Sequence, residues 1–298
     1  MAELKGVFPP IVTIFKSDGS IDLEANKKHL DFLISKGVDG IAYFGTSGEF
    51  FSILLEEKKR FINEMISYVN KRVKILVGIG STNKNEVLEF LDFLKNKDID
   101  GVLLINPYFA IYDEREVEAY YNEIAHYTNF DIIIYNFPQL TGFNFSYDLI
   151  SKLVENNRNI AGIKDTIADQ GHLIDLLEVK KINKDFIVYS AFESQAFGAL
   201  FNGVEGLINA TANFAPEFTV GLWKNFQEKN LEICGEMYNK MCNAMKIYKL
   251  SSPLLLACKQ AVYDRVLGYD GFERGPALPL TNENKIKVKA ILNELNLI

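Results

Sequence analysis

The sequence predicts a single closed (β/α)8 barrel, and three observations support this fold. Short apolar runs rich in β-branched residues recur along the chain, longer segments with the periodicity of an amphipathic helix separate them, and the runs number eight. Parallel strands that are covered by helices on both faces have this pattern. The eight units fit between Gly6 and Pro216, which suits a barrel. A doubly wound open sheet is the alternative, because alternation of strands and helices alone does not prove closure.

The elements are expected in the following order. The apolar runs predict strands at Gly6–Phe15, Gly40–Phe44, Lys74–Ile79, Gly101–Ile105, Ile132–Tyr135, Ile160–Ile163, Phe186–Ser190 and Gly206–Ala210. The helical segments between them are clearest at Asp22–Ser35, Leu55–Asn70, Asn85–Lys97 and Glu114–Tyr127. Each is long enough to return the chain to the start of the next parallel strand. Beyond Pro216 the pattern is helical only, at Phe218–Glu228, Leu231–Tyr248, Pro253–Leu267 and Glu283–Leu295. We expect residues 1–230 to form the catalytic barrel and residues 231–298 a helical extension of the same domain.

The composition is that of a soluble globular protein, with 298 residues of which 48% are hydrophobic and 24% charged. The net charge of −7 gives the chain no overall basic character of the kind that nucleic-acid-binding proteins have. No stretch reaches the ~18 apolar residues of a membrane span, and the N-terminal segment lacks the apolar core of a secretion signal. We therefore expect a cytoplasmic protein that binds small molecules and neither nucleic acid nor membrane.

The sequence contains no metal-binding or triad motif. His29, His126 and His172 are far apart, and each falls in a predicted helix, so they are interpreted as ordinary helix residues. The G-x-G of residues 78–80 lacks the third glycine of a dinucleotide-binding loop, and no Ser-His-Asp set can be assembled. The three cysteines lie in the last quarter of the chain without CxxC spacing, and we interpret them as buried free thiols.

Two polar residues follow neighbouring strands of the predicted barrel, at the end where barrel enzymes carry their active sites. Lys164 comes directly after the sixth apolar run. A buried ammonium loses hydration, which favours the free amine, a nucleophile for carbonyl groups. Tyr135 ends the fifth run, so its phenol is expected near that amine, where it can move protons during Schiff-base formation. A surface lysine and an ordinary core aromatic are the alternative interpretations of these two residues.

A glycine-rich turn follows the second predicted strand. Its sequence is FGTSGEF, in which Gly45 and Gly48 flank Thr46 and Ser47. Backbone N–H groups in such a turn can hold a carboxylate, and the two hydroxyls can relay protons. By itself this turn is a weak indication of a binding site.

Four motifs in order resemble the signature of the dihydrodipicolinate synthase and N-acetylneuraminate lyase superfamily. They are FGTSGEF at 44–50, INPYF at 105–109, YNFPQLTG at 135–142 and GIKDT at 162–166. The resemblance extends to the opening GVFPPIVTIF and to NATANFAP at 209–216, so it covers nearly the whole chain. Within the superfamily, the sequence is most similar to bacterial 2-keto-3-deoxygluconate aldolases.

The resemblance implies a role for each site residue. Lys164 is the Schiff-base lysine, Tyr135 and Ser47 are catalytic, and Thr46 with Ser47 binds the carboxylate of the keto acid. Further substrate contacts are implied for Gly48, Thr166, Glu193 and Ile208. Pyruvate condenses with the lysine, loses a methyl proton to give an enamine and adds to an aldehyde, and cleavage runs these steps backward. No metal or organic cofactor is implied, because the iminium is the electron sink, and the family implies a homotetramer.

Departures from the family pattern narrow the substrate. Dihydrodipicolinate synthases carry an arginine after the YN-x-P turn that grips a second carboxylate, whereas this chain has Leu140. Neuraminate lyases follow strand seven with Gly-Tyr-Asp-Glu, whereas this chain has Ala-Phe-Glu-Ser at 191–194, of which Glu193 can still accept hydroxyl hydrogen bonds. Many members have Tyr-Tyr after the proline of strand four, whereas here Tyr108 precedes Phe109, which cannot pass a proton. Either the relay runs through Ser47, Tyr112 or water, or turnover is slow, or the protein has drifted toward another role.

The sequence therefore predicts a class I aldolase that uses pyruvate and glyceraldehyde, or a related short sugar acid. The alternatives of the same mechanism are dihydrodipicolinate synthase and N-acetylneuraminate lyase. An alternative of another class, motivated by Phe109, is a weakly catalytic keto-acid-binding protein.

Overall fold

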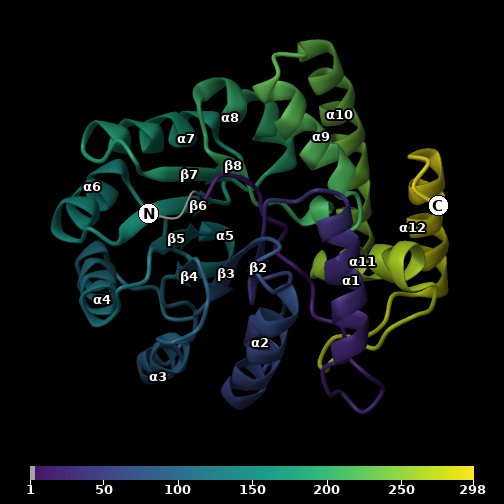
Figure 1. The fold of residues 1–298 in the computed structure, drawn as a ribbon, viewed down its shortest axis with the longest axis horizontal. Helices are drawn as coiled ribbons and strands as arrows, with labels where there is room; N and C mark the ends of the chain where they lie inside the picture. The colour runs from purple at the N-terminus through teal and green to yellow at the C-terminus, as the bar shows by residue number, and fades with distance from the viewer. Residues whose placement is uncertain (1–3) are drawn as a thin grey trace.

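A computed structural model describes residues 4–298 and contains one eight-stranded parallel sheet. Figure 1 shows the strands at the centre and the helices around them. The strands are β1 (Gly6–Val7), β2 (Gly40–Tyr43), β3 (Lys74–Gly78), β4 (Gly101–Ile105), β5 (Ile132–Asn136), β6 (Ile160–Asp165), β7 (Ile187–Ser190) and β8 (Gly206–Leu207). Their order is β1-β8-β7-β6-β5-β4-β3-β2.

Backbone hydrogen bonds between the two ends of this order close the barrel. The N–H of Asp39 donates to the carbonyl of Val7 at 3.0 Å, and that of Ala42 donates to Pro9 at 3.0 Å. Ile11 returns a bond to the carbonyl of Ala42 at 3.1 Å. The sheet therefore has no free edge, which confirms the (β/α)8 barrel and excludes the doubly wound alternative.

Two strands are much shorter than the sequence predicts. β1 ends at Val7, although the apolar run continues to Phe15, because Pro9 and Pro10 lack the amide hydrogens that a ladder needs. β8 ends at Leu207 because the chain then leaves the ladder and enters a 3₁₀ turn at Ala210–Asn213. The other six strands lie within one or two residues of their predicted ends.

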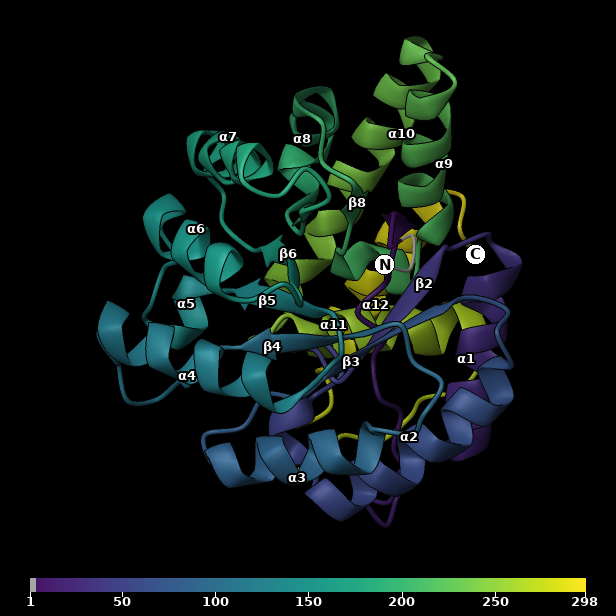
Figure 2. The same ribbon diagram turned by 60° about the vertical axis from the view of Figure 1, so that its left-hand side comes forward.

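Twelve α-helices lie in residues 4–298, and the helices between the strands form the outer layer (Figures 1 and 2). They are α1 (Leu23–Ser35), α2 (Leu55–Val69), α3 (Lys84–Leu94), α4 (Glu114–Tyr127), α5 (Pro138–Thr141), α6 (Tyr147–Asn156), α7 (Gln170–Leu177), α8 (Ala196–Asn202), α9 (Pro216–Gln227), α10 (Leu231–Ala244), α11 (Leu255–Val262) and α12 (Asn282–Glu294). Several begin at side-chain caps, such as Asp22, which accepts from the N–H of Ala25 at 3.1 Å.

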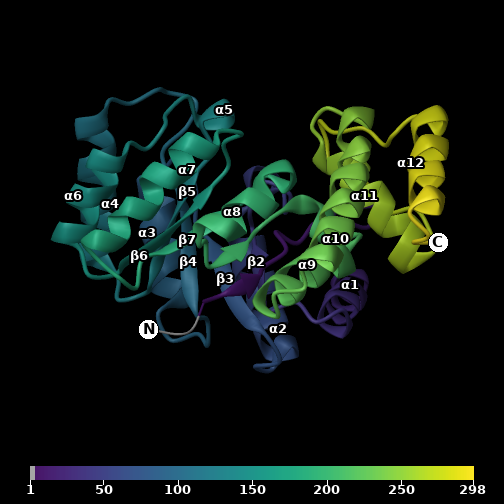
Figure 3. The same ribbon diagram turned by 90° about the horizontal axis from the view of Figure 1, so that it is seen from above.

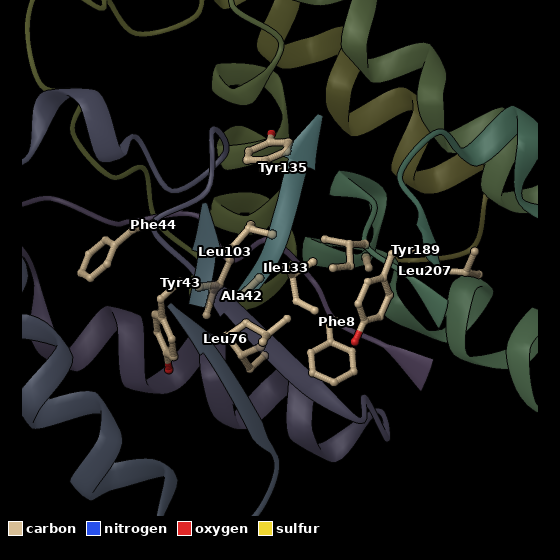
Figure 4. Packing of buried hydrophobic residues seen from close by; sticks show 14 of the residues in the cluster. Phe8, Ala42, Tyr43, Phe44, Leu76, Leu103, Ile133, Tyr135, Tyr189 and Leu207 are labelled. Atoms are coloured by element: carbon tan, nitrogen blue, oxygen red, sulfur yellow. The ribbon is translucent and has the colours of Figure 1, made fainter. Parts of the chain in front are cut away.

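Apolar side chains fill the barrel. Figure 4 shows Phe8, Leu76, Ile133 and Tyr189 meeting inside it, all buried. The rings of Phe8 and Tyr189 pack edge to face with their centroids 5.6 Å apart. The barrel interior is thus a packed core, and the space for a ligand lies at the ends of the strands.

Helices α10 to α12 form the C-terminal extension, on one side of the barrel (Figure 3). A buried ion-pair triad anchors it: the Nζ atom of Lys259 in α11 lies 2.7 Å from carboxylate oxygens of both Glu49 and Glu273. Lys259 is fully buried and also lies over the ring of Phe15, 4.7 Å from its centroid. The extension is therefore tied directly to the loop that follows β2.

Two further sequence-based interpretations concern the cysteines and the membrane. All three cysteines are free, and Cys234 and Cys258 are buried, whereas Cys242 is only partly buried. Across residues 4–298, no helix combines the length and the apolar character that crossing a bilayer requires.

Candidate active site

A cavity of about 300 Å³ lies at the carboxyl ends of the strands. Its wall contains all but one of the site residues expected from the sequence: Thr46, Ser47, Tyr135, Lys164, Thr166, Glu193 and Ile208. These residues end or follow strands β2, β5, β6, β7 and β8. Parallel strands bring their carboxyl ends to one face of a barrel, which is why residues up to 162 positions apart in the sequence meet there.

Lys164 and Tyr135 form the centre of this cavity. They are directly paired across the β5–β6 ladder, and the Nζ atom of Lys164 lies 3.8 Å from the centroid of the Tyr135 ring. Both side chains are buried, and Figure 4 shows Tyr135 beyond the core side chains of the barrel. Lys164 forms no ion pair with any carboxylate of residues 4–298. Its amine is therefore held by an aromatic face, which leaves the nitrogen available to a carbonyl carbon.

The turn after β2 presents hydroxyl groups to the same space. The Oγ1 atom of Thr46 lies 3.0 Å from the hydroxyl of Tyr135, and Ser47 lines the cavity beside it. Thr13 fixes the turn from below by donating its hydroxyl to the carbonyl of Gly48 at 2.8 Å. A hydroxyl chain from Thr46 to Tyr135 can carry a proton between a bound carboxylate and the lysine.

Gly48 is the predicted site residue that does not line the cavity. Its N–H donates to the carbonyl of Gly45 at 3.0 Å, within the turn. A side chain at position 48 would come within 3.0 Å of the carbonyl oxygen of Ile11 and 3.2 Å of the backbone nitrogen of Phe44. Glycine is needed here because the turn packs closely against the chain that follows β1.

Glu193 is a buried carboxylate in the wall of the cavity. Its carboxylate accepts hydrogen bonds from the N–H of Thr211 at 3.0 Å and from the hydroxyl of Tyr248. Burial raises the pKa of Glu193, although these two hydrogen bonds act in the opposite direction. On the same wall, the hydroxyl of Thr166 is buried without a hydrogen-bond partner among residues 4–298. Both groups are suited to bind a hydroxyl of a substrate.

Apolar side chains form the remaining wall. Phe137 and Leu140 come from the segment around α5, Phe192 follows β7, and Leu254 and Leu255 come from the C-terminal extension. No lysine, arginine or histidine other than Lys164 lines the cavity among the described residues. Lys164 is thus the one basic side chain in a cavity wall that is otherwise largely apolar.

The C-terminal extension contributes residues that sequence reasoning missed. Tyr248, Ser252, Pro253, Leu254 and Leu255 all line the cavity. They lie 84 or more positions after Lys164, and nothing in their local sequence marks them as site residues. Only the docking of the extension against the barrel brings them there.

Phe109, which stands where many family members have a relay tyrosine, does not line the cavity, and neither does Tyr112. Phe109 is 97% exposed and has a φ of +77°, in the left-handed region. Tyr112 is 40% exposed. Within one chain, the hydroxyl contact observed with Tyr135 is therefore that of Thr46.

Comparison with known proteins places the chain in a family. The model of the dihydrodipicolinate synthetase family matches residues 3–295. The chain belongs to this family. It is accordingly a carbon–carbon lyase of the Schiff-base-forming aldolases, with the barrel fold of its relatives.

Curated relatives of the family cover almost the whole chain. The probable 2-dehydro-3-deoxy-D-pentonate aldolase of Escherichia coli K12 is 33% identical, over 98% of this chain and 97% of its own. A putative 2-dehydro-3-deoxy-D-gluconate aldolase of the same organism is 32% identical over the same shares. A 4-hydroxy-tetrahydrodipicolinate synthase of Methanococcus vannielii is 31% identical over 99% of this chain and all of its own.

A solved structure shows the same architecture with a bound keto acid. The crystal structure of an E. coli K12 prophage protein of the dihydrodipicolinic acid synthase family, in complex with pyruvate, matches with a TM-score of 0.95. The two chains are 31% identical, and the match covers 99% of each. The family and the fold of this chain agree with its sequence motifs.

Proposed function

We propose that the chain is a class I aldolase that cleaves or forms 2-keto-3-deoxy sugar acids from pyruvate and a short hydroxyaldehyde such as glyceraldehyde. The observation that carries the proposal is the buried, unpaired amine of Lys164, held 3.8 Å from the ring centroid of Tyr135 at the carboxyl end of the barrel. The relatives named for 2-dehydro-3-deoxy acids, and the pyruvate complex of a relative, support the same chemistry.

The first stage is formation of the Schiff base. The amine of Lys164 adds to C2 of pyruvate, and the carbinolamine loses water to give an iminium. The hydroxyl of Tyr135, which is hydrogen-bonded to Thr46, supplies the proton that lets the oxygen leave as water. Thr46 and Ser47 hold the carboxylate of pyruvate with their hydroxyls and the backbone of the turn.

The second stage is carbon–carbon bond formation. The phenolate of Tyr135, left by the first stage, takes a proton from C3, and the electron pair of that C–H bond moves into an enamine. The enamine carbon attacks the aldehyde carbon, and the Tyr135 hydroxyl then supplies the proton to the aldehyde oxygen. The aldehyde oxygen thereby becomes a hydroxyl, and water releases the product from Lys164. Cleavage of the sugar acid is the reverse sequence. The iminium nitrogen accepts and returns the electron pair, so the steps need no metal or organic cofactor.

The apolar wall favours an uncharged aldehyde. Aspartate semialdehyde brings a second carboxylate, and Leu140, where dihydrodipicolinate synthases have arginine, offers it no partner. Glu193 and Thr166 can instead bind hydroxyl groups of a short polyol. The cavity volume of about 300 Å³ also suits a short sugar acid better than a nine-carbon sialic acid.

A comparison of substrates tests this proposal. The purified protein should release pyruvate from 2-keto-3-deoxygluconate or 2-keto-3-deoxypentonate with a kcat/KM at least about 100-fold above that for N-acetylneuraminate. The reason is that hydrogen bonds from the site to the substrate hydroxyls discriminate strongly between substrates. Pyruvate release is measured by its enzymatic reduction, and condensation of pyruvate with aspartate semialdehyde is assayed in parallel. Preference for aspartate semialdehyde or N-acetylneuraminate would contradict the proposal. A pyruvate adduct without turnover on any aldehyde would leave a keto-acid-binding protein.

We also propose a homotetramer, on the basis of an exposed apolar surface formed by Phe51, Leu54, Phe109 and Ile111. These side chains are between 55% and 97% exposed. Phe50, which follows β2, packs on Tyr108, which follows β4, with ring centroids 5.8 Å apart, so the segments after these two strands lie side by side. Apolar surface of this kind marks a contact between chains.

Light scattering after size-exclusion chromatography tests the tetramer. The wild-type mass should be four times that of the chain, and a double substitution of Phe109→Lys with Ile111→Lys should lower it to that of a dimer or monomer. Ile286→Lys, on α12, serves as the control because Ile286 is a similarly exposed apolar residue, 69% accessible, outside this surface. A monomeric wild-type protein would refute the proposal.

A further inference from the structure

A buried polar network lies directly behind the catalytic pair. Asn136 and Asp165 are the next residues after Tyr135 and Lys164, and they are paired in the same ladder. Successive residues of a strand point to opposite faces, so these two side chains face the helices when their neighbours face the cavity. The amide of Asn136 donates to Oδ1 of Asp165 at 2.8 Å, and the Asp165 side chain is fully buried.

His172, in α7, completes this network with both ring nitrogens. Its Nδ1 lies 3.2 Å from Oδ2 of Asp165, and its Nε2 lies 2.9 Å from the carbonyl oxygen of Phe145. Both partners are acceptors, and a neutral imidazole has only one N–H to donate. The two hydrogen bonds therefore form together only when the ring is a doubly protonated imidazolium, whose charge the Asp165 carboxylate balances.

The network also fixes one wall of the cavity. The N–H of Phe145 donates to Oδ1 of Asn136 at 3.4 Å, while its carbonyl accepts from His172. Phe145 belongs to the segment of residues 143–145, which closely follows α5, and α5 carries the cavity residue Leu140. His172 thus links the strand end that bears Lys164 to the loop that shapes the aldehyde side of the site.

The charged groups around His172 are Asp165 from β6 and Asp169 at the start of α7. Helix α6 turns its charged residues, Asp148, Lys152 and Glu155, to solvent. Strand β7 and helix α8 contain no carboxylate or cation. In the 3₁₀ turn that follows α7, Lys180 pairs with Glu205 and Lys181 with Glu178, and Tyr189 of β7 donates to the carbonyl of Leu4. Within residues 4–298, no lysine or arginine bonds to His172 or Asp165.

We propose that His172, as an imidazolium, is a positioning residue. It acts through Asp165 to hold Lys164, and through residues 143–145 to hold the cavity wall formed by α5, in the geometry that the reaction needs. This contribution to turnover is lost as the ring deprotonates. The inference rests on the proposed aldolase function, which supplies the reaction that the network positions.

The direction of the pH dependence follows from the surroundings of the ring. Burial lowers the pKa of His172, but the hydrogen bond and charge of Asp165, the Phe145 carbonyl and the charge of Asp169 outweigh it, so the pKa is raised above its usual value. A folded-state pKa above the unfolded value means that the network is complete below the unfolded pKa, about 6.5. Its contribution is lost as the pH rises through the folded-state pKa.

The experiment compares the wild type with His172→Gln over about pH 6 to about pH 9. The ratio of their kcat/KM values for retro-aldol cleavage cancels every pH effect that the two proteins have in common, such as that of the reaction itself. We expect the wild type to be about 10-fold more active at the acid end, as for a sub-ångström displacement of a reacting group, and the ratio to approach one at the alkaline end. Asp165→Asn should flatten the profile in the same way, whereas His126→Gln, at an exposed residue of α4, should follow the wild type.

Ring nitrogen spectra of ¹⁵N-histidine-labelled protein give the second readout. The chain has only three histidines, so His172→Gln and His126→Gln assign the signals. We expect both nitrogens of His172 to be protonated at about pH 6, with a pKa above the ordinary value of about 6.5. A singly protonated ring there, or a wild-type-to-variant ratio that stays constant with pH, would overturn the proposal.

The ring titration requires no substrate, so this inference and the proposed function can fail separately. If cleavage is not observed, the ratio is measured on the rate of adduct formation with pyruvate under cyanoborohydride. If the His172 ring titrates as expected but neither turnover nor an adduct is observed, both the aldolase function and the positioning role are overturned. If turnover is observed but the ratio of wild type to variant does not change with pH, the positioning role alone is overturned.

Discussion

Lys164→Ala is expected to abolish the covalent adduct with pyruvate and to lower kcat for aldol cleavage by a factor on the order of 10⁴ or more. In the proposed mechanism the amine forms the bond to C2 and the resulting iminium takes the electron pair. No other lysine lines the cavity among the described residues. Intact-mass and peptide mass spectrometry after treatment with pyruvate and borohydride measure the adduct and locate it.

Tyr135→Phe is the matched control for this experiment. It keeps the ring over which Lys164 lies and removes only the hydroxyl that contacts Thr46 at 3.0 Å. The adduct should still form, but more slowly, because a proton relay contributes about 10²- to 10⁴-fold. An adduct that maps to another lysine, or persists in Lys164→Ala, would refute the assignment of the Schiff-base residue.

Lys259→Met is expected to lower the free energy of unfolding by about 3–5 kcal/mol, the largest stability effect that we predict. The substitution leaves Glu49 and Glu273 buried and facing each other without a cation between them. Burial already raises the pKa of Glu49, although Lys259 acts against this, so removal of the lysine worsens an unfavourable position. Urea unfolding followed by circular dichroism, at one fixed protein concentration, measures the change.

Lys287→Met provides the comparison, because Lys287 forms an exposed ion pair with Glu283, 2.6 Å long, on α12. Water and salt screen an exposed pair, so this variant should unfold close to the wild type. Equal effects of the two substitutions would show that the buried triad does not stabilise the fold.

The triad also connects stability to the active site. Glu49 adopts a left-handed backbone conformation, with a φ of +56°, two residues after Ser47. Its carboxylate is held by a lysine of the C-terminal extension, and the same extension supplies Tyr248 and Leu255 to the cavity. The extension therefore belongs to the candidate site, because it both holds the turn that follows β2 and forms part of the cavity wall.

The sequence predicted the strands that carry the candidate site. A barrel strand is buried on both faces, so five or six consecutive apolar residues are enough to identify it. The sequence also predicted the pairing of Lys164 with Tyr135, since consecutive parallel strands of a barrel are neighbours and their polar ends meet at one face. The same reasoning was wrong about the length of β1, where Pro9 and Pro10 interrupt the ladder while keeping the apolar pattern.

The sequence by itself thus determined the barrel and the polar residues that meet in one cavity at the carboxyl ends of its strands. Only the tertiary structure decided the partners of buried polar groups. His172 looked like an ordinary helix residue until both of its ring nitrogens were found facing acceptors, and Lys259 is separated from Glu49 by 210 positions. The physical reason is that strand and helix formation depends on neighbours a few residues away, whereas the charge and hydrogen bonding of a buried side chain depend on which distant segments fold against it.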